Sequence, residues 1–152
     1  VTNYFTTKRI VSQKLKAENI ALKEVLPLAS SFELKDNFPK NGFDDKNNIV
    51  GYVLKVTATG YSSQIEALVG LDRDFKVTGV KILSQTETPG LGSKISEKNF
   101  LSQFIGKFSE KILLKKDAQA GEIDGVTSAT ISSRAITDAI RKKINEFKKT
   151  VK

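Results

Sequence analysis

Hydroxyl side chains gather in one short stretch, residues 124–133, which reads Asp-Gly-Val-Thr-Ser-Ala-Thr-Ile-Ser-Ser. An amphipathic pattern typical of a helix follows it, so these hydroxyls stand at a predicted helix N-terminus. Serine and threonine commonly cap helices, and Asp124-Gly125 is a common turn pair. The first N–H groups of a helix are unpaired and its dipole favours negative charge, so the stretch also suits a phosphate. A capped helix and a phosphate site, with Thr130 at the phosphate, are both open interpretations here.

A second stretch rich in turn residues reads Glu87-Thr88-Pro89-Gly90-Leu91-Gly92. A Pro-Gly pair favours a type II turn, and Gly92 adds freedom at positive φ. The simplest interpretation is a connection between a strand and a helix. A loop of this composition can also let its backbone lie against a flat ligand.

The residue types that are missing restrict the chemistry. The 152 residues include no cysteine and no histidine. This excludes disulfides, thiol catalysis, zinc-thiolate sites, iron–sulfur clusters and the Ser-His-Asp triad. Any redox chemistry would therefore require an organic cofactor. The close acidic groups at 44–45 and 72–74 are typical of turns, so we expect no metal site.

An excess of positive charge could indicate a different function. Lysine and arginine number 25 against 17 aspartates and glutamates, and Lys142-Lys143 and Lys148-Lys149 lie on the predicted last helix. A basic domain can bind nucleic acid or anionic membrane, and a non-catalytic module of that kind is the alternative function. With three tyrosines and no tryptophan for base stacking, and no RNA-binding signature, we expect no nucleic-acid partner.

Hydrophobic periodicity predicts a single α+β domain, an antiparallel β-sheet flanked by helices. Apolar residues alternate in three runs joined by short turns, which favours a meander. These runs lie at 50–59, 65–71 and 77–83. Helical spacing predicts a final helix over 131–149 and, capped by Ser96, a helix that extends to Phe108.

The remaining segments are harder to assign. We expect an N-terminal helix over residues 6–26 that Pro27 ends, a mostly irregular segment over 30–48, and a strand at 111–115. Residues 1–48 then form a helix with its connecting segment, and residues 49–152 form the main domain. The chain begins at Val1 and has no methionine, so we expect that an upstream piece, such as a membrane anchor, has been trimmed.

Together the two stretches resemble one family. It is the FMN-binding domain shared by the G subunit of the Rnf electron-transport complex and the C subunit of the sodium-translocating NADH:quinone reductase. That family has a Glu-Thr-Pro-Gly-Leu-Gly loop after its central strands, which residues 87–92 match completely. Its later Asp-x-x-(Ser/Thr)-Gly-Ala-Thr motif opens the final helix. Asp124, Thr127, Ala129 and Thr130 match this motif, and Ser128 stands where the family usually has glycine.

The resemblance implies a covalent flavin. Thr130 would carry FMN esterified through its phosphate, attached by a flavin transferase with FAD as donor. Asp124, Thr127, Ala129 and Thr130 would form the sequence that the transferase recognises. Residues of both stretches would border the cofactor, namely Glu87, Thr88, Gly90, Leu91, Gly92, Thr127, Ser128, Ala129 and Ile131. No catalytic acid or base is implied.

The resemblance also implies partners and a location. The chain would be an electron-transfer subunit of a membrane ion-translocating oxidoreductase of the Rnf type. The other subunits of that complex would be its partners, and the full-length protein would be anchored in the cell membrane. The domain would lie on the outer, periplasmic or extracellular face. A related FMN-domain respiratory protein with different partners is a further alternative.

Overall fold

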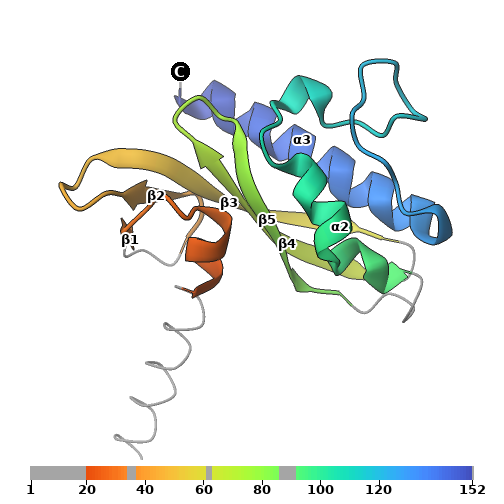
Figure 1. The fold of residues 1–152 in the computed structure, drawn as a ribbon, viewed down its shortest axis with the longest axis horizontal. Coiled ribbons are helices and arrows are strands. Elements are labelled where there is room, and N and C mark those ends of the chain that lie inside the picture. Colours follow the sequence, from red (N-terminus) through yellow and green to blue (C-terminus); the bar gives the residue numbers. More distant parts are fainter. Residues whose placement is uncertain (1–19, 34–36, 61–62, 86–91, 152) are drawn as a thin grey trace, which may run out of the picture.

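Five strands form one antiparallel sheet in which strands adjacent in sequence are adjacent in space (Figure 1). The computed structural model describes residues 20–33, 37–60, 63–85 and 92–151. The strands are β1 (Ser31–Phe32), β2 (Lys40–Phe43), β3 (Ile49–Thr59), β4 (Gln64–Asp72) and β5 (Val77–Ser84). The three alternating runs became β3, β4 and β5, so the predicted meander and the α+β class are confirmed.

The prediction of a mostly irregular segment over residues 30–48 is wrong where β1 and β2 form. These strands have only two and four residues, which is too short for alternation to be recognised. Pro39 and Gly42 flank or interrupt the pattern with residues that favour turns. Strand β2 forms because it pairs with the first half of β3, from Phe43↔Ile49 to Lys40↔Val53.

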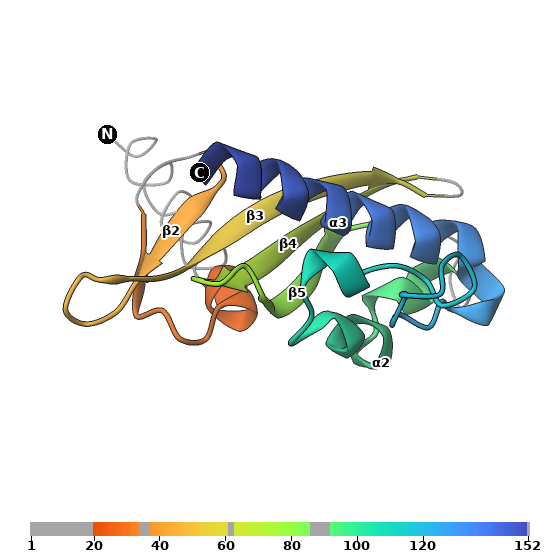
Figure 2. The ribbon, with the colours of Figure 1, turned by 90° about the horizontal axis from the view of Figure 1, so that it is seen from above.

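The last helix, α3 (Thr130–Val151), covers one face of the sheet (Figures 1 and 2). The helix predicted over 131–149 is therefore confirmed. Its apolar stripe packs on the inward side chains of β3 and β4, such as Leu54, Val56 and Ala67. The stripe members that are fully or nearly fully buried are Ile136, Ile140, Ile144 and Phe147. Burial of this stripe holds the helix in place, since an isolated amphipathic helix is marginal in water.

Helix α3 runs antiparallel to β3. Near the start of β3, the ring of Tyr52 meets the ring of Phe147 at a centroid distance of 5.0 Å. Near the end of β3, Ala58 and Thr59 border the same hollow as Ala135. The first residue of α3 therefore lies at the end of the sheet where β3 stops.

The opposite face of the sheet is covered in part by the N-terminal segment. Residues 20–25 are helical and Leu26 is not; residues 6–19 of the helix predicted over 6–26 lie outside the described residues. The segment approaches the sheet closely at Gly70, where an added Cβ would lie 2.0 Å from the Val25 carbonyl oxygen. The Thr78 hydroxyl donates a hydrogen bond of 2.6 Å to the same oxygen. Only glycine permits this contact at position 70.

The predicted helix from Ser96 to Phe108 is wrong as a continuous element. The chain forms η1 (Gly92–Ser96), α2 (Lys98–Leu101) and η2 (Ser102–Phe104) instead. Ser96 does not cap α2, whose N-cap residue is Glu97. The helix stops because the backbone turns to pair with β5: Gly106 N–H donates to the Val77 carbonyl at 2.8 Å, and Val77 N–H donates to the Lys107 carbonyl at 3.0 Å.

The strand predicted at 111–115 is also wrong. The chain there forms the short helix η3 (Ser109–Lys111) and a single parallel bridge between Leu114 and Ile123. Both bridge residues are fully buried, so their burial accounts for the apolar pattern that favoured a strand. Among the helices of the described residues, none is long and apolar enough to cross a membrane.

Candidate functional site at the start of helix α3

The second predicted stretch lies at the end of the sheet where β5, the strand that precedes the first stretch in sequence, also ends. Strand β5 ends at Ser84, which pairs with Glu66, and Glu66 pairs with Thr57 near the end of β3. Residues 86–91 follow from this end, and α3 begins there. Glu87, Thr88, Gly90 and Leu91 lie outside the described residues, whereas Gly92 begins η1. Because η1 contacts η4 (Thr127–Ala129), the chain that leaves the first stretch lies against the second.

Three hydroxyls of the second stretch make no hydrogen bond within the described residues. Thr127 and Ser128 are exposed and Thr130 is half-buried. In the described part of the chain, no group is hydrogen-bonded to these three side chains. Val126, the N-cap residue of η4, provides no side-chain cap. The capping interpretation therefore does not explain these hydroxyls, and they are available to a ligand.

The backbone around Ser128 is relaxed. Among the described non-glycine residues, only Asn47 and Phe75 have positive φ, so Ser128 does not adopt the conformation that favours glycine. The turn closes through a hydrogen bond of 2.8 Å from Ala129 N–H to the Val126 carbonyl. Serine therefore replaces the family's usual glycine without backbone strain.

The buried hydroxyl of Ser133 stabilises the turn that contains Thr127 and Ser128. The Ser133 side chain is fully buried; its Oγ accepts a hydrogen bond from Val126 N–H at 2.9 Å and donates one to the Ala129 carbonyl at 2.7 Å. It thereby joins both ends of the turn that contains Thr127 and Ser128. In the sequence, Ser133 was only one of several hydroxyls, with no separate role. Its position four residues after Ala129, which allows this bond in a helix, is the signal that was available.

Asp124, which opens the motif, is held by two residues that sequence reasoning missed. Asp124 N–H donates to Gln103 Oε1 at 2.6 Å, and Gln103 Nε2 donates to the Asp124 carbonyl at 3.0 Å. Lys115 Nζ lies 3.2 Å from Asp124 Oδ2 in an exposed ion pair. No sequence pattern links these positions, because the contact depends on the path of the chain between η2 and the motif.

An ion pair fixes the next turn of α3 to the preceding loop. Arg134 Nε and Nη2 donate to the two carboxylate oxygens of Asp117 at 2.7 and 2.8 Å. This two-bond geometry is the one in which arginine binds carboxylates most specifically. The Arg134 hydrogen bond lowers the pKa of Asp117 below its usual 3.8, and Asp117 raises the pKa of Arg134.

The residues at this end of the sheet fit a phosphate group. The site combines the positive end of a 22-residue helix with hydroxyls that have no hydrogen-bond partner among the described residues. The small, buried Ala129 lets a ligand approach the backbone. The carboxylate of Asp124 is balanced by Lys115. Thr127, Ser128 and Thr130 would hold the phosphate of FMN, and Ile131, which is 52% exposed, offers an apolar contact beside it.

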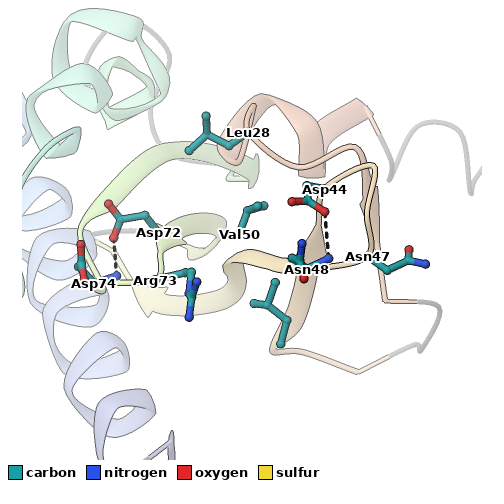
Figure 3. A pocket seen from close by; sticks show the side chains of 9 residues that line it. Leu28, Asp44, Asn47, Asn48, Val50, Asp72, Arg73 and Asp74 are labelled. Atoms are coloured by element: carbon teal, nitrogen blue, oxygen red, sulfur yellow. Dashed lines mark hydrogen bonds between the residues drawn. The ribbon is translucent and has the colours of Figure 1, made fainter.

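A separate hollow of about 740 Å³ lies between two hairpin turns at the opposite end of the sheet (Figure 3). Asp44 Oδ1 accepts hydrogen bonds from Lys46 and Asn48 N–H, and Asp72 Oδ1 does the same for Asp74 and Lys76. These carboxylates therefore stabilise their own turns, as predicted. Within the described ranges, no group of three or more acidic or histidine side chains is placed to hold a metal ion.

Comparisons with known proteins identify the family of this chain. The model of the FMN-binding domain family matches residues 60–145. The G subunit of an ion-translocating oxidoreductase complex from Methanosarcina acetivorans is 34% identical over 82% of this chain and 72% of its own length. The G subunit of the Na(+)-translocating ferredoxin:NAD(+) oxidoreductase complex from Acetobacterium woodii is 31% identical over 97% of this chain and 82% of its own length.

A solved structure shares the fold. The crystal structure of Shewanella oneidensis NqrC aligns with a TM-score of 0.58 at 24% identity, over 85% of this chain and 74% of that one. The family match covers more than half of the chain, and it includes β4, β5 and the start of α3. The chain therefore belongs to the FMN-binding domain family.

Proposed function

We propose that this chain is an electron-transfer subunit of an ion-translocating oxidoreductase complex and that it carries FMN esterified to Thr130. The observation that supports this most directly is the half-buried Thr130 hydroxyl, which lacks a hydrogen-bond partner among the described residues at the start of α3. The relatives named as G subunits of such complexes support the assignment to a complex.

Attachment of the flavin needs one substitution at phosphorus. Thr130 Oγ1 forms a bond to the phosphorus of the FMN half of FAD, the bond from that phosphorus to the AMP half breaks, and AMP leaves. The hydroxyl proton passes to a base of the flavin transferase. The N-terminus of α3 stabilises the negative phosphate while this occurs, since its N–H groups and dipole favour an anion.

The attached flavin supplies the ability to accept and release one or two electrons. The chain itself positions the phosphate end, and no acid or base of the chain takes part in electron transfer. Glu87, Thr88, Gly90, Leu91 and Gly92 would border the flavin ring. The contact between η1, which begins at Gly92, and η4 supports this part of the proposal.

The remaining parts of the proposal concern maturation and location. A flavin transferase would recognise Asp124, Thr127, Ala129 and Thr130. The full-length protein would be anchored in the cell membrane, with this domain on its outer face and the other subunits of the complex as partners. Gln103 and Ser133 would hold the recognition segment in the shape that the transferase reads.

Mass spectrometry tests the attachment directly. The chain is produced together with a flavin transferase, unfolded, washed and digested with trypsin. We expect the peptide 117–134, which contains Thr130, to carry the mass of FMN less one water, and fragmentation to place it on Thr130. An unmodified peptide, or flavin on Thr127 or Ser128, would contradict the assignment.

Co-purification tests membership of a complex independently. A tagged chain is expressed in its own cells and isolated with mild detergent. We expect the other subunits of an ion-translocating oxidoreductase in constant ratio. Flavin on Thr130 with a different set of partners would favour the related respiratory protein instead.

A further inference from the structure

The second half of β3 has an open edge. Strand β2 pairs with β3 only as far as Lys40↔Val53, and Pro39, which precedes Lys40, has no N–H with which to continue the ladder. On its other side β3 pairs with β4 as far as Thr59↔Gln64. In the ranges that the structure describes, no strand pairs with residues 54–59 on the β2 side, and Figure 2 shows β2 beside only the first part of β3.

An open edge has a definite binding preference. In an antiparallel sheet, alternate residues of a strand direct their N–H and C=O groups to each side. Every second residue of the segment 54–59 therefore presents a donor and an acceptor to the open side. Such a row is a template for one further strand, which would add backbone hydrogen bonds at the spacing of the sheet.

Two hollows show that there is room for this strand. One, of about 560 Å³, lies between the edge and α3 and is bordered by Ala135 and Ala139, whose small side chains leave space under the helix. The other, of about 580 Å³, lies toward Phe38 and Glu66. Both hollows are bordered by Lys55, Thr57 and Lys143, so they meet along the edge.

The charges around the edge favour an acidic occupant. Lys55, Lys142 and Lys143 are exposed there. Of the nearby carboxylates, Asp138 forms an ion pair with Arg141 at 2.7 Å. The remaining two, Glu66 and Glu146, carry less negative charge than the three lysines carry positive charge. A second copy of this chain would bring two sets of the same lysines to one interface, and like charges on paired strands are destabilising.

We propose that the open edge of β3 binds an extended, acid-rich segment of another subunit, which adds to the sheet as a sixth strand. Side chains of a strand alternate between its two faces. Acidic residues on one face of the segment would meet Lys142 and Lys143, and those on the other would meet Lys55. The identity of the partner rests on the proposed membership of an oxidoreductase complex, whereas the strand addition itself does not depend on flavin.

Hydrogen exchange in the assembled complex tests this proposal. Exchange of the peptide that covers residues 54–59 is measured by mass spectrometry in the isolated chain and in the purified complex. We expect exchange to slow at least about tenfold in the complex, because opening then requires the loss of several backbone hydrogen bonds. The double variant Lys55→Glu/Lys143→Glu should restore fast exchange. The control Lys23→Glu/Lys111→Glu, with the same change in net charge at exposed positions away from this edge, should not.

A photo-reactive residue at position 57 identifies the occupant in the same complex. We expect a cross-link to an acid-rich segment of another subunit. Equal exchange in the isolated and assembled states would overturn the proposal, as would protection that the double variant does not remove. A cross-link between two copies of this chain would also overturn it, in favour of a dimer. If the chain joins no complex, its proposed function fails as well. If the chain joins a complex but hydrogen exchange of residues 54–59 does not slow, only the proposal of strand addition fails.

Discussion

The carboxamide of Gln103 and the backbone of Asp124 form a two-bond pair between residues 21 positions apart in the chain. The pair holds the first residue of the hydroxyl-rich segment, and Ser133 holds its turn four residues from Ala129. The segment between these two anchors carries Thr127, Ser128 and, directly after its turn, Thr130. The presentation of the hydroxyls thus depends on residues that do not themselves face a ligand.

Replacement of Gln103 by leucine should slow FMN attachment by roughly tenfold, because a loosened segment occupies the reactive geometry less often. The loss in stability should be only about 1 kcal/mol, since the bonds are near the surface. The rate of attachment by the transferase is measured from the flavin fluorescence of the modified chain, and the melting temperature is measured in parallel. Ser102→Ala, at an exposed neighbour, is the control. A lower melting temperature with an unchanged attachment rate would show that Gln103 has only a structural role.

Ser133→Ala should lower the free energy of unfolding by about 1–3 kcal/mol, because it leaves the Val126 N–H without its partner beside a buried position. Urea titration followed by circular dichroism measures the change. Ser128→Ala removes a hydroxyl that is exposed, and it should stay within about 0.5 kcal/mol of the wild type. Equal effects of the two substitutions would contradict the structural assignment of Ser133.

Thr130→Ala should abolish flavin that survives unfolding and washing, because no oxygen is left to bond to phosphorus. Thr130→Ser should retain it, and Thr127→Ala, which changes a neighbouring exposed hydroxyl, should retain at least part. In-gel fluorescence of the denatured chain measures all three. Flavin retained by Thr130→Ala would place the ester on another residue.

Gly70→Ala should destabilise the fold by about 1–3 kcal/mol or more, since a Cβ would lie 2.0 Å from the Val25 carbonyl oxygen and the N-terminal segment would have to move. Gly125→Ala is the matched control, because the nearest atom to its Cβ is at 3.5 Å, an ordinary contact. Thermal unfolding of the two variants compares them. Equal melting temperatures would show that the segment does not pack on Gly70.

The pKa of Asp117 should lie below 3.8, because the Arg134 guanidinium donates hydrogen bonds to its ionised form. A carboxyl with a lowered folded-state pKa stabilises the fold above its unfolded pKa, and this contribution is lost as the pH falls through the folded value. Carboxyl-carbon NMR titration should show the pKa of Asp117 rising in Arg134→Gln and staying unchanged in Lys98→Gln. No change in Arg134→Gln would mean that the pair does not form in solution.

Alternation and helical spacing were enough to predict the meander and the last helix. Strands β3, β4 and β5 each have at least eight residues, so their apolar patterns are long enough to be recognised in the sequence. Strands β1 and β2 are short, and the helix predicted from Ser96 to Phe108 is interrupted because Gly106 and Lys107 pair with Val77. These features could not be predicted, because they depend on backbone groups that come together only in the folded chain.

The candidate site, like the fold, could be predicted from the sequence only in part. Residue types and order alone determined that a hydroxyl-rich segment opens an amphipathic helix, since capping preferences and 3.6-residue periodicity are local properties of the chain. Only the tertiary structure decided which hydroxyls are free and which are structural. Helix α3 packs one face on the sheet, so Ser133 is buried and bonded to the turn, while Thr127 and Ser128 face outward and Thr130 stays half-buried without a described partner.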